Sequence, residues 1–197
     1  MSADGPTLNA GIEQPAAKLP GNTGLLVLVV GPSGAGKDTL LAGAAAALAQ
    51  RSDVVFARRV ITRASHGSED HDTVSAKDFD AGVEAGRFLL SWRAHGLGYA
   101  LGSELRHQLD AGRIVIANVS RDVVEQARAQ FPNVRVVLID APADVRHSRL
   151  LARGRETPAE IELRLSRAIE DVSADVIIVN DGDREAGVAR LVAAMVQ

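Results

Sequence analysis

The feature that most constrains this chain is a glycine-rich turn between an apolar run and an alanine-rich run. The turn reads Gly31-Pro32-Ser33-Gly34-Ala35-Gly36-Lys37-Asp38-Thr39. The run at residues 25–30 predicts a buried parallel strand, and the run at residues 40–49 predicts a helix. A strand, a glycine-rich turn ending in Gly-Lys and a helix together predict a phosphate-binding P-loop. We therefore expect backbone N–H groups, the helix N-terminus and Lys37 to face the phosphates of a nucleotide.

One position departs from the usual P-loop pattern. After Gly-Lys the pattern has Ser or Thr, whose hydroxyl contacts Mg²⁺, whereas here Asp38 follows Lys37 and Thr39 comes next. Asp38 can itself approach the metal, because carboxylate oxygen suits Mg²⁺. Alternatively, Thr39 supplies the hydroxyl and Asp38 is a first-turn acid that the helix dipole favours. Asp38 and Thr39 are thus both candidate metal ligands.

The remaining apolar runs predict an α/β fold. Strands are expected at residues 54–61, 88–92, 113–119, 134–140 and 176–179, with helices between them, and residues 94–102 are expected to form a glycine-rich connection. Ser75 is a candidate N-cap for a helix at residues 75–86, with Asp78 three residues on. Alternating strands and helices predict three layers around a mostly parallel sheet.

Composition narrows the class of protein. The chain has 197 residues, a net charge of -3 and no cysteine, which excludes disulfides and thiolate sites and gives no electrostatic sign of nucleic-acid binding. No apolar run approaches the length of a membrane span. Residues 1–23 are rich in Gly and Pro without an apolar period, so we expect a disordered leader there and a folded domain at residues 24–197. The default expectation is a cytoplasmic protein without membrane or nucleic-acid partners.

Arginines cluster where two predicted helices are interrupted. They are Arg149, Arg153, Arg155, Arg164 and Arg167, around Gly154 and Pro158. Such arginines can close over a nucleotide and neutralise the charge of a phosphoryl group in transfer. The alternative is a solvated basic face, but a helix broken at residues 153–158 favours a hinged lid, at about residues 153–160.

Other polar residues stand at predicted strand ends. Arg63 is a candidate for holding an anionic substrate. Asp140 ends an apolar strand, where it either holds Mg²⁺ through water or caps the next helix. The acidic loop at residues 69–72 has the composition of a metal site but no ligand spacing, and we interpret it as solvated.

These motifs resemble those of the guanylate kinase family over nearly all of the folded chain. The matching pieces are the P-loop, Thr62-Arg63, Phe79, Gly86-Arg87-Phe88-Leu89, Trp92, Gly96 with Tyr99, Arg153-Gly154-Arg155 and Ile177-Ile178-Val179-Asn180-Asp181. The resemblance implies a P-loop kinase of the nucleoside monophosphate kinase type. It also implies an inserted acceptor-binding lobe at about residues 61–100 and an arginine lid.

Guanylate kinases read the guanine edge with two acids, and this chain has Ser91 and Asn118 in those places. A hydroxyl and a carboxamide match the adjacent N–H donors of guanine poorly. The chain is more similar to the ribose 1,5-bisphosphate phosphokinases of phosphonate catabolism. The shared segments are Ile61-Thr62-Arg63, residues 67–71, residues 90–99, the Gly-Lys-Asp variant and Arg153-Gly154-Arg155-Glu156. Gly98 stands where that family commonly has a second tyrosine.

The closer resemblance implies transfer of the ATP γ-phosphoryl group to ribose 1,5-bisphosphate, with Mg²⁺, by a monomer or homodimer. It implies that Lys37, Arg153, Arg155 and Arg164 are catalytic and that Asn180 belongs to the nucleotide site with the P-loop. The implied acceptor site contains Arg63, Glu69, Ser91, Tyr99 and Asn118. Two alternatives remain: a guanylate-type nucleoside monophosphate kinase, and a non-catalytic interaction module. Such modules typically lose the P-loop lysine and the lid arginines, and this chain keeps Lys37, Arg153 and Arg155.

Overall fold

The computed structural model describes residues 24–63, 71–94, 96–154, 161–162 and 172–196. The leader expected at residues 1–23 and most of the lid expected at residues 153–160 therefore lie outside the described residues. No helix in the described ranges is long and apolar enough to cross a membrane.

A five-stranded parallel sheet forms the centre of the fold, in the order β2-β7-β1-β8-β9. Its strands are β1 (Leu25–Val30), β2 (Val54–Phe56), β7 (Ile114–Asn118), β8 (Val134–Asp140) and β9 (Val176–Val179). Strand β1 lies in the middle, and its residues from Leu26 to Val30 are all fully buried. A strand covered on both faces needs such a continuous apolar run, which confirms the parallel, three-layer fold predicted from the sequence.

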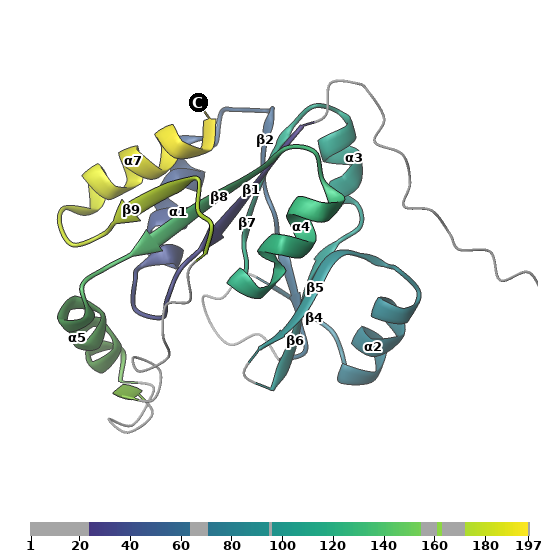
Figure 1. Ribbon diagram of the computed structural model, residues 1–197, viewed down its shortest axis with the longest axis horizontal. Helices are drawn as coiled ribbons and strands as arrows, with labels where there is room; N and C mark the ends of the chain where they lie inside the picture. Colours follow the sequence, from purple (N-terminus) through teal and green to yellow (C-terminus); the bar gives the residue numbers. More distant parts are fainter. Residues whose placement is uncertain (1–23, 64–70, 95, 155–160, 163–171, 197) are drawn as a thin grey trace, which may run out of the picture.

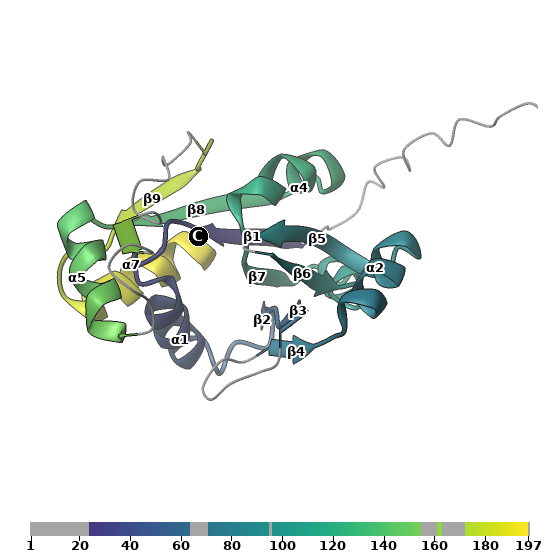
Figure 2. The same ribbon diagram turned by 90° about the horizontal axis from the view of Figure 1, so that it is seen from below.

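Helices cover both faces of this sheet. Helices α1 (Lys37–Ala47) and α7 (Arg184–Val196) pack on one face, and α3 (Leu105–Asp110) and α4 (Val124–Gln130) pack on the other (Figures 1 and 2). A 3-10 turn, η1 (Arg121–Val123), leads into α4, and α5 (Ala143–Arg153) follows β8. Helix α1 begins at Lys37 rather than at residue 40, so the last residues of the glycine-rich turn already belong to its first turn.

A second, four-stranded sheet is inserted between β2 and β7, in the order β4-β3-β6-β5. It contains β3 (Arg59–Ile61), β4 (His71–Thr73), β5 (Phe88–Ala94) and β6 (Leu97–Gly102), together with helix α2 (Ala76–Glu84). We call this insertion, residues 59–102, the lobe. Ser75 caps α2 as predicted, because its Oγ accepts a hydrogen bond of 3.0 Å from the Asp78 amide. Figure 2 shows α2 and α5 at opposite ends of the long axis.

Two predictions about the lobe are wrong. The strand expected at residues 54–61 is two short strands that belong to different sheets. The break follows Ala57, whose amide still donates to the Ile116 carbonyl of β7 at 2.7 Å. The next residue, Arg58, forms an ion pair with Asp72 of the lobe, with 2.9 Å between its Nε and the Asp72 Oδ1. The connection expected at residues 94–102 is strand β6 for most of its length, and Gly96, whose φ is 74°, is the turn residue directly before it.

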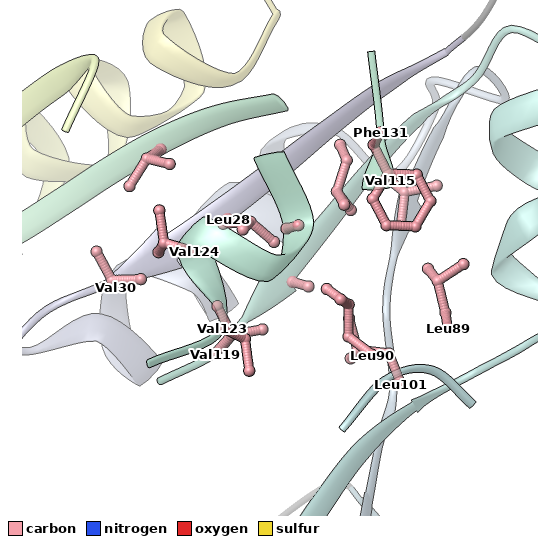
Figure 3. Packing of buried hydrophobic residues seen from close by; sticks show 14 of the residues in the cluster. Leu28, Val30, Leu89, Leu90, Leu101, Val115, Val119, Val123, Val124 and Phe131 are labelled. Atoms are coloured by element: carbon pink, nitrogen blue, oxygen red, sulfur yellow. The ribbon is translucent and has the colours of Figure 1, made fainter. Parts of the chain in front are cut away.

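One apolar cluster joins the lobe to the central sheet. It combines Leu28 and Val115 of the central sheet with Leu90 and Leu101 of the lobe and with Phe131 after α4 (Figure 3). All five side chains are buried. Burial of apolar surface stabilises such contacts in proportion to their area, so this cluster holds the lobe against the sheet.

Candidate functional site

The P-loop leaves the carboxyl end of the central strand β1, where ligands of open parallel sheets usually bind. Gly31, Gly34 and Gly36 have φ angles of 148°, 81° and 89°, in the region that favours glycine. Gly36 is the N-cap of α1, and no side chain caps that helix by a hydrogen bond. The N–H groups of its first turn are thus directed at the loop, as an anion-binding site requires.

Lys37 is the first residue of α1 and folds back over the loop. Its Nζ donates to the Gly31 carbonyl at 2.5 Å and to the Pro32 carbonyl at 3.1 Å. The ammonium group is therefore held within the curve of the loop. From this position it can be directed at the β- and γ-phosphates of a bound nucleotide.

Two side chains from distant segments donate hydrogen bonds to backbone carbonyls of the P-loop. Asn180, which follows β9, is buried, and its Nδ2 donates to the Ala35 carbonyl at 2.7 Å. Arg149 of α5 extends its Nη1 to 3.5 Å from the Gly34 carbonyl and 3.4 Å from the Ala35 carbonyl. The structure thus places Asn180 in the predicted nucleotide site as a support of the loop backbone.

Asp38 lies in the first turn of α1 and is exposed, and it meets Asn118 at the carboxyl end of β7. The Asn118 Nδ2 donates to the Asp38 Oδ1 at 2.9 Å. The sequence places Asn118 among the acceptor-binding residues, whereas the structure joins it to the P-loop helix.

Asp38 and Thr39 have the donor chemistry of a Mg²⁺ site that is completed by a nucleotide. Both are exposed, and the Asp38 Oδ2 takes no part in the hydrogen bond to Asn118. Within the described ranges, no three His, Cys, Asp or Glu side chains gather into a group that could hold a metal. Mg²⁺ usually takes one or two protein oxygens together with phosphate oxygens and waters, so these residues fit it in that role.

The structure corrects the interpretation of Asp140 as a helix cap. The N-cap of α5 is Pro142, without a side-chain hydrogen bond, while the Asp140 Oδ1 accepts from the Ala141 amide at 2.8 Å. The same oxygen lies 3.9 Å from the Nε of Arg146, which is buried and also donates to the Ala141 carbonyl. Arg146 was not among the predicted site residues, because nothing in its local pattern separates it from the other arginines of α5.

In the lobe, Tyr99 stacks on Trp92, with ring centroids 5.5 Å apart and planes 9° apart. Cross-strand partners share a face of a sheet, so the pairs Trp92–Tyr99 and Ser91–Ala100 lie on opposite faces. The structure therefore does not bring Ser91 and Tyr99 together on one face. A side chain at position 98 would meet the Phe79 ring, since a Cβ there would lie 2.7 Å from it, and this explains the glycine beside Tyr99.

Arg63 is exposed at the end of β3, and its backbone is fixed by β4. Its carbonyl accepts from the His71 Nε2 and from the Thr73 Oγ1, each at 3.2 Å. His71 is buried, and its Nδ1 has no hydrogen-bond partner among the described residues. The sequence analysis assigned His71 to a solvated loop, because the short pairing of β3 with β4 that buries it leaves no periodic pattern.

Part of the predicted site cannot be placed. Glu69, Arg155 and Arg164 lie outside the described residues, as does the side chain of Arg153, the last residue of α5. After residues 155–160, Ile161 is fully buried. The Oε1 of Glu162 lies 3.3 Å from the Nε2 of His147 on α5.

Comparison with solved structures supports the same fold. The crystal structure of guanylate kinase from Anaplasma phagocytophilum matches with a TM-score of 0.65 over 89% of this chain and 88% of that chain. The sequence identity is 18%, so this likeness concerns the fold alone.

Comparison with sequences identifies the family. The family model described as AAA domain matches residues 26–172. The ribose 1,5-bisphosphate phosphokinase PhnN of Bradyrhizobium diazoefficiens is 51% identical over 164 residues, covering 82% of this chain and 83% of that protein. The protein of the same name from Methylobacterium radiotolerans is 49% identical over 170 residues, covering 86% and 96%. The chain therefore belongs to the ribose 1,5-bisphosphate phosphokinase family.

Proposed function

We propose that this protein transfers the γ-phosphoryl group of ATP to the 1-phosphate of ribose 1,5-bisphosphate, giving 5-phosphoribosyl 1-diphosphate and ADP. The observation that carries the proposal is the P-loop at the carboxyl end of β1, with Lys37 held at its centre, in a chain about half identical to kinases of that name. The acceptor is a small molecule, and the proposal places the enzyme in the cytoplasm as a monomer or homodimer.

The reaction requires that the two substrates be positioned in line and that the negative charge of the transferring phosphoryl group be neutralised. An oxygen of the acceptor phosphate attacks the γ-phosphorus as the bond from that phosphorus to the β,γ-bridging oxygen breaks, and ADP leaves with the electron pair. A phosphate oxygen is already an anionic nucleophile, so the step needs no general base. Catalysis then depends on in-line geometry and on cations around the transferring group.

Each proposed role is supported by the position of a described residue or by the resemblance to the family. Lys37 binds the β- and γ-phosphates, while the backbone of the loop holds the phosphate chain. Arg153, Arg155 and Arg164 neutralise the group in transfer. Asp38 and Thr39 would hold Mg²⁺, which neutralises phosphate charge when bound. Arg63, Glu69 and Tyr99 contact the acceptor, and Ser91 remains a candidate on the other face of the lobe sheet.

The acceptor is tested by measuring ADP release with purified protein, ATP and Mg²⁺. Ribose 1,5-bisphosphate, ribose 5-phosphate, GMP and AMP are offered in parallel. We expect turnover with ribose 1,5-bisphosphate alone, and 5-phosphoribosyl 1-diphosphate as the product by mass spectrometry. Turnover with GMP would contradict the proposal and support a guanylate-type kinase, while nucleotide binding without turnover on any acceptor would support an interaction module.

Replacement of Tyr99 by phenylalanine tests the acceptor side of the site. The phenyl ring keeps the stack on Trp92, so thermal stability should not change, but the hydroxyl that would bind an acceptor phosphate is lost. A hydrogen bond to a charged group is worth enough to lower kcat/KM for the acceptor by about tenfold. The KM for ATP should stay the same. Equal increases in both KM values would show that Tyr99 does not act on the acceptor.

A further inference from the structure

The two positions at which this chain departs most clearly from related sequence patterns are in contact. Asp38 replaces the Ser or Thr of the P-loop pattern. Asn118 is the neutral residue that ends β7, and its Nδ2 lies 2.9 Å from the Asp38 Oδ1. The two residues are 80 positions apart in the sequence, so only the fold reveals that they form one pair.

Both partners are carried by well-fixed backbone. Asn118 pairs with Val29 in the parallel register of β1 and β7, and the next amide, that of Val119, donates to the Val29 carbonyl at 3.2 Å. Asp38 follows Lys37 in the first turn of α1. The end of β7 is therefore locked beside the strand that leads into the P-loop, and the contact with Asp38 is set by the sheet register.

The chemistry of the pair gives the hydrogen bond one direction. An ionised carboxylate only accepts, so the Asn118 amide must present its NH₂ group to Asp38. This contact uses a donor of Asn118, a residue that the family resemblance places in the acceptor site. It also fixes the orientation of the carboxylate, whose Oδ2 is not part of this hydrogen bond.

We propose that Asn118 is a positioning residue for Asp38, and that an aspartate after the P-loop lysine requires a neutral donor at position 118. An acid at position 118 would lose the N–H donor and place a second carboxylate within hydrogen-bond distance of the first, where like charges repel. An aspartate at position 38 is therefore incompatible with an acid at position 118, where an acid could accept hydrogen bonds from N–H groups of an acceptor. Only the consequence for acceptor choice rests on the proposed function.

The test is a double-mutant cycle on ATP binding, which does not depend on the identity of the acceptor. The proteins are the wild type, Asn118→Asp, Asp38→Ser and the double variant. Calorimetry gives ATP affinity with and without Mg²⁺, and thermal unfolding gives stability. We expect Asn118→Asp to weaken binding of ATP with Mg²⁺ by about tenfold in the wild type. In the Asp38→Ser background, where position 38 has no carboxylate to repel the new one, Asn118→Asp should lower the affinity for ATP with Mg²⁺ by less than about twofold.

A matched control and a second variant keep the outcome decisive. Gln126→Glu on the exposed surface of α4 makes the same amide-to-carboxylate change and should leave binding and stability unaltered. If Asn118→Asp does not fold, Asn118→Leu removes the donor without adding charge, and its effect should likewise vanish in Asp38→Ser. Equal losses in both backgrounds would overturn the proposal. The ADP-release assay with the four acceptors would still test the function separately.

Discussion

Replacement of Lys37 by methionine should lower kcat by on the order of 10³-fold, because it removes the cation that the proposed function assigns to the β- and γ-phosphates. The ammonium group now lies on the Gly31 and Pro32 carbonyls, at 2.5 and 3.1 Å, so it is already within the loop that the phosphates enter. A methionine side chain fills a similar volume without a charge or a donor. Initial rates with ATP, Mg²⁺ and ribose 1,5-bisphosphate measure the loss, and thermal unfolding shows whether the fold is intact.

Lys77 offers a matched control for this substitution. It lies on the exposed surface of α2, so Lys77→Met removes a lysine charge without touching the P-loop. Its kcat should equal that of the wild type, because the substituted side chain is exposed on α2 and does not belong to the P-loop. If Lys37→Met lowered kcat by less than about tenfold, the P-loop lysine would not be the main cation on the phosphates.

Replacement of Gly31 by alanine should destabilise the protein by about 3 kcal/mol or more, through clash and backbone strain together. A Cβ at this position would lie 2.0 Å from the Ile139 carbonyl oxygen and 3.0 Å from its carbon. These atoms belong to the backbone of β8, which is hydrogen-bonded between β1 and β9 and cannot move aside. The φ of 148° is also one that residues with a side chain rarely adopt. Urea unfolding measures the loss of stability. We expect the affinity for ATP to fall as well, because Gly31 is the first residue of the P-loop.

Gly86 separates the two causes. Its φ is 63°, but a Cβ there would meet nothing within 4 Å. Gly86→Ala should therefore cost only the conformational strain, about 1–2 kcal/mol, and leave ATP binding unchanged. Equal destabilisation by the two substitutions would mean that the contact with Ile139 is relieved at little cost.

The central sheet and the P-loop could be predicted because their information is local. An uninterrupted apolar run, a turn with glycines at fixed spacing and a helix-forming run identify β1, the loop and α1 without any tertiary contact. The same reasoning predicted β8 and β9 with their observed bounds, residues 134–140 and 176–179. The start of α1 was predicted too late, because Lys37, Asp38 and Thr39 were counted with the turn.

The lobe was harder to predict from the sequence, because its strands are short and depend on partners that are distant in the chain. Nothing between residues 54 and 61 shows that the chain leaves one sheet for another. The break depends on the bond from Ala57 to Ile116 and on the pairing of β3 with β6. Strand β6 was taken for a connection because of its glycines. At one of them, Gly98, a Cβ would lie 2.7 Å from the Phe79 ring of α2, which is distant in the sequence.

The sequence says more about which residues belong near the P-loop than about how they are held there. Lys37 and Asp38 follow from the P-loop motif, and Asn180, which the family resemblance implied, also contacts the loop. The pairing of Asp38 with Asn118, the burial of His71 and the contact of Arg149 with the loop carbonyls all depend on the fold. Sequence patterns cannot reveal them, because each joins elements that are separated by other secondary structure.

The contact between Asn180 and the Ala35 carbonyl spans 145 positions, and this distance has a consequence for the protein as it is made. Strand β1 and the P-loop are synthesised before the segments that support the loop, which are the end of β7, α5 and the residue after β9. We expect the loop to reach its final geometry only after Asn180 has been translated, because this residue holds the Ala35 carbonyl. A nascent chain stalled before that residue should thus fail to retain ATP, so the newborn protein acquires its nucleotide affinity late, after almost all of its sheet has emerged.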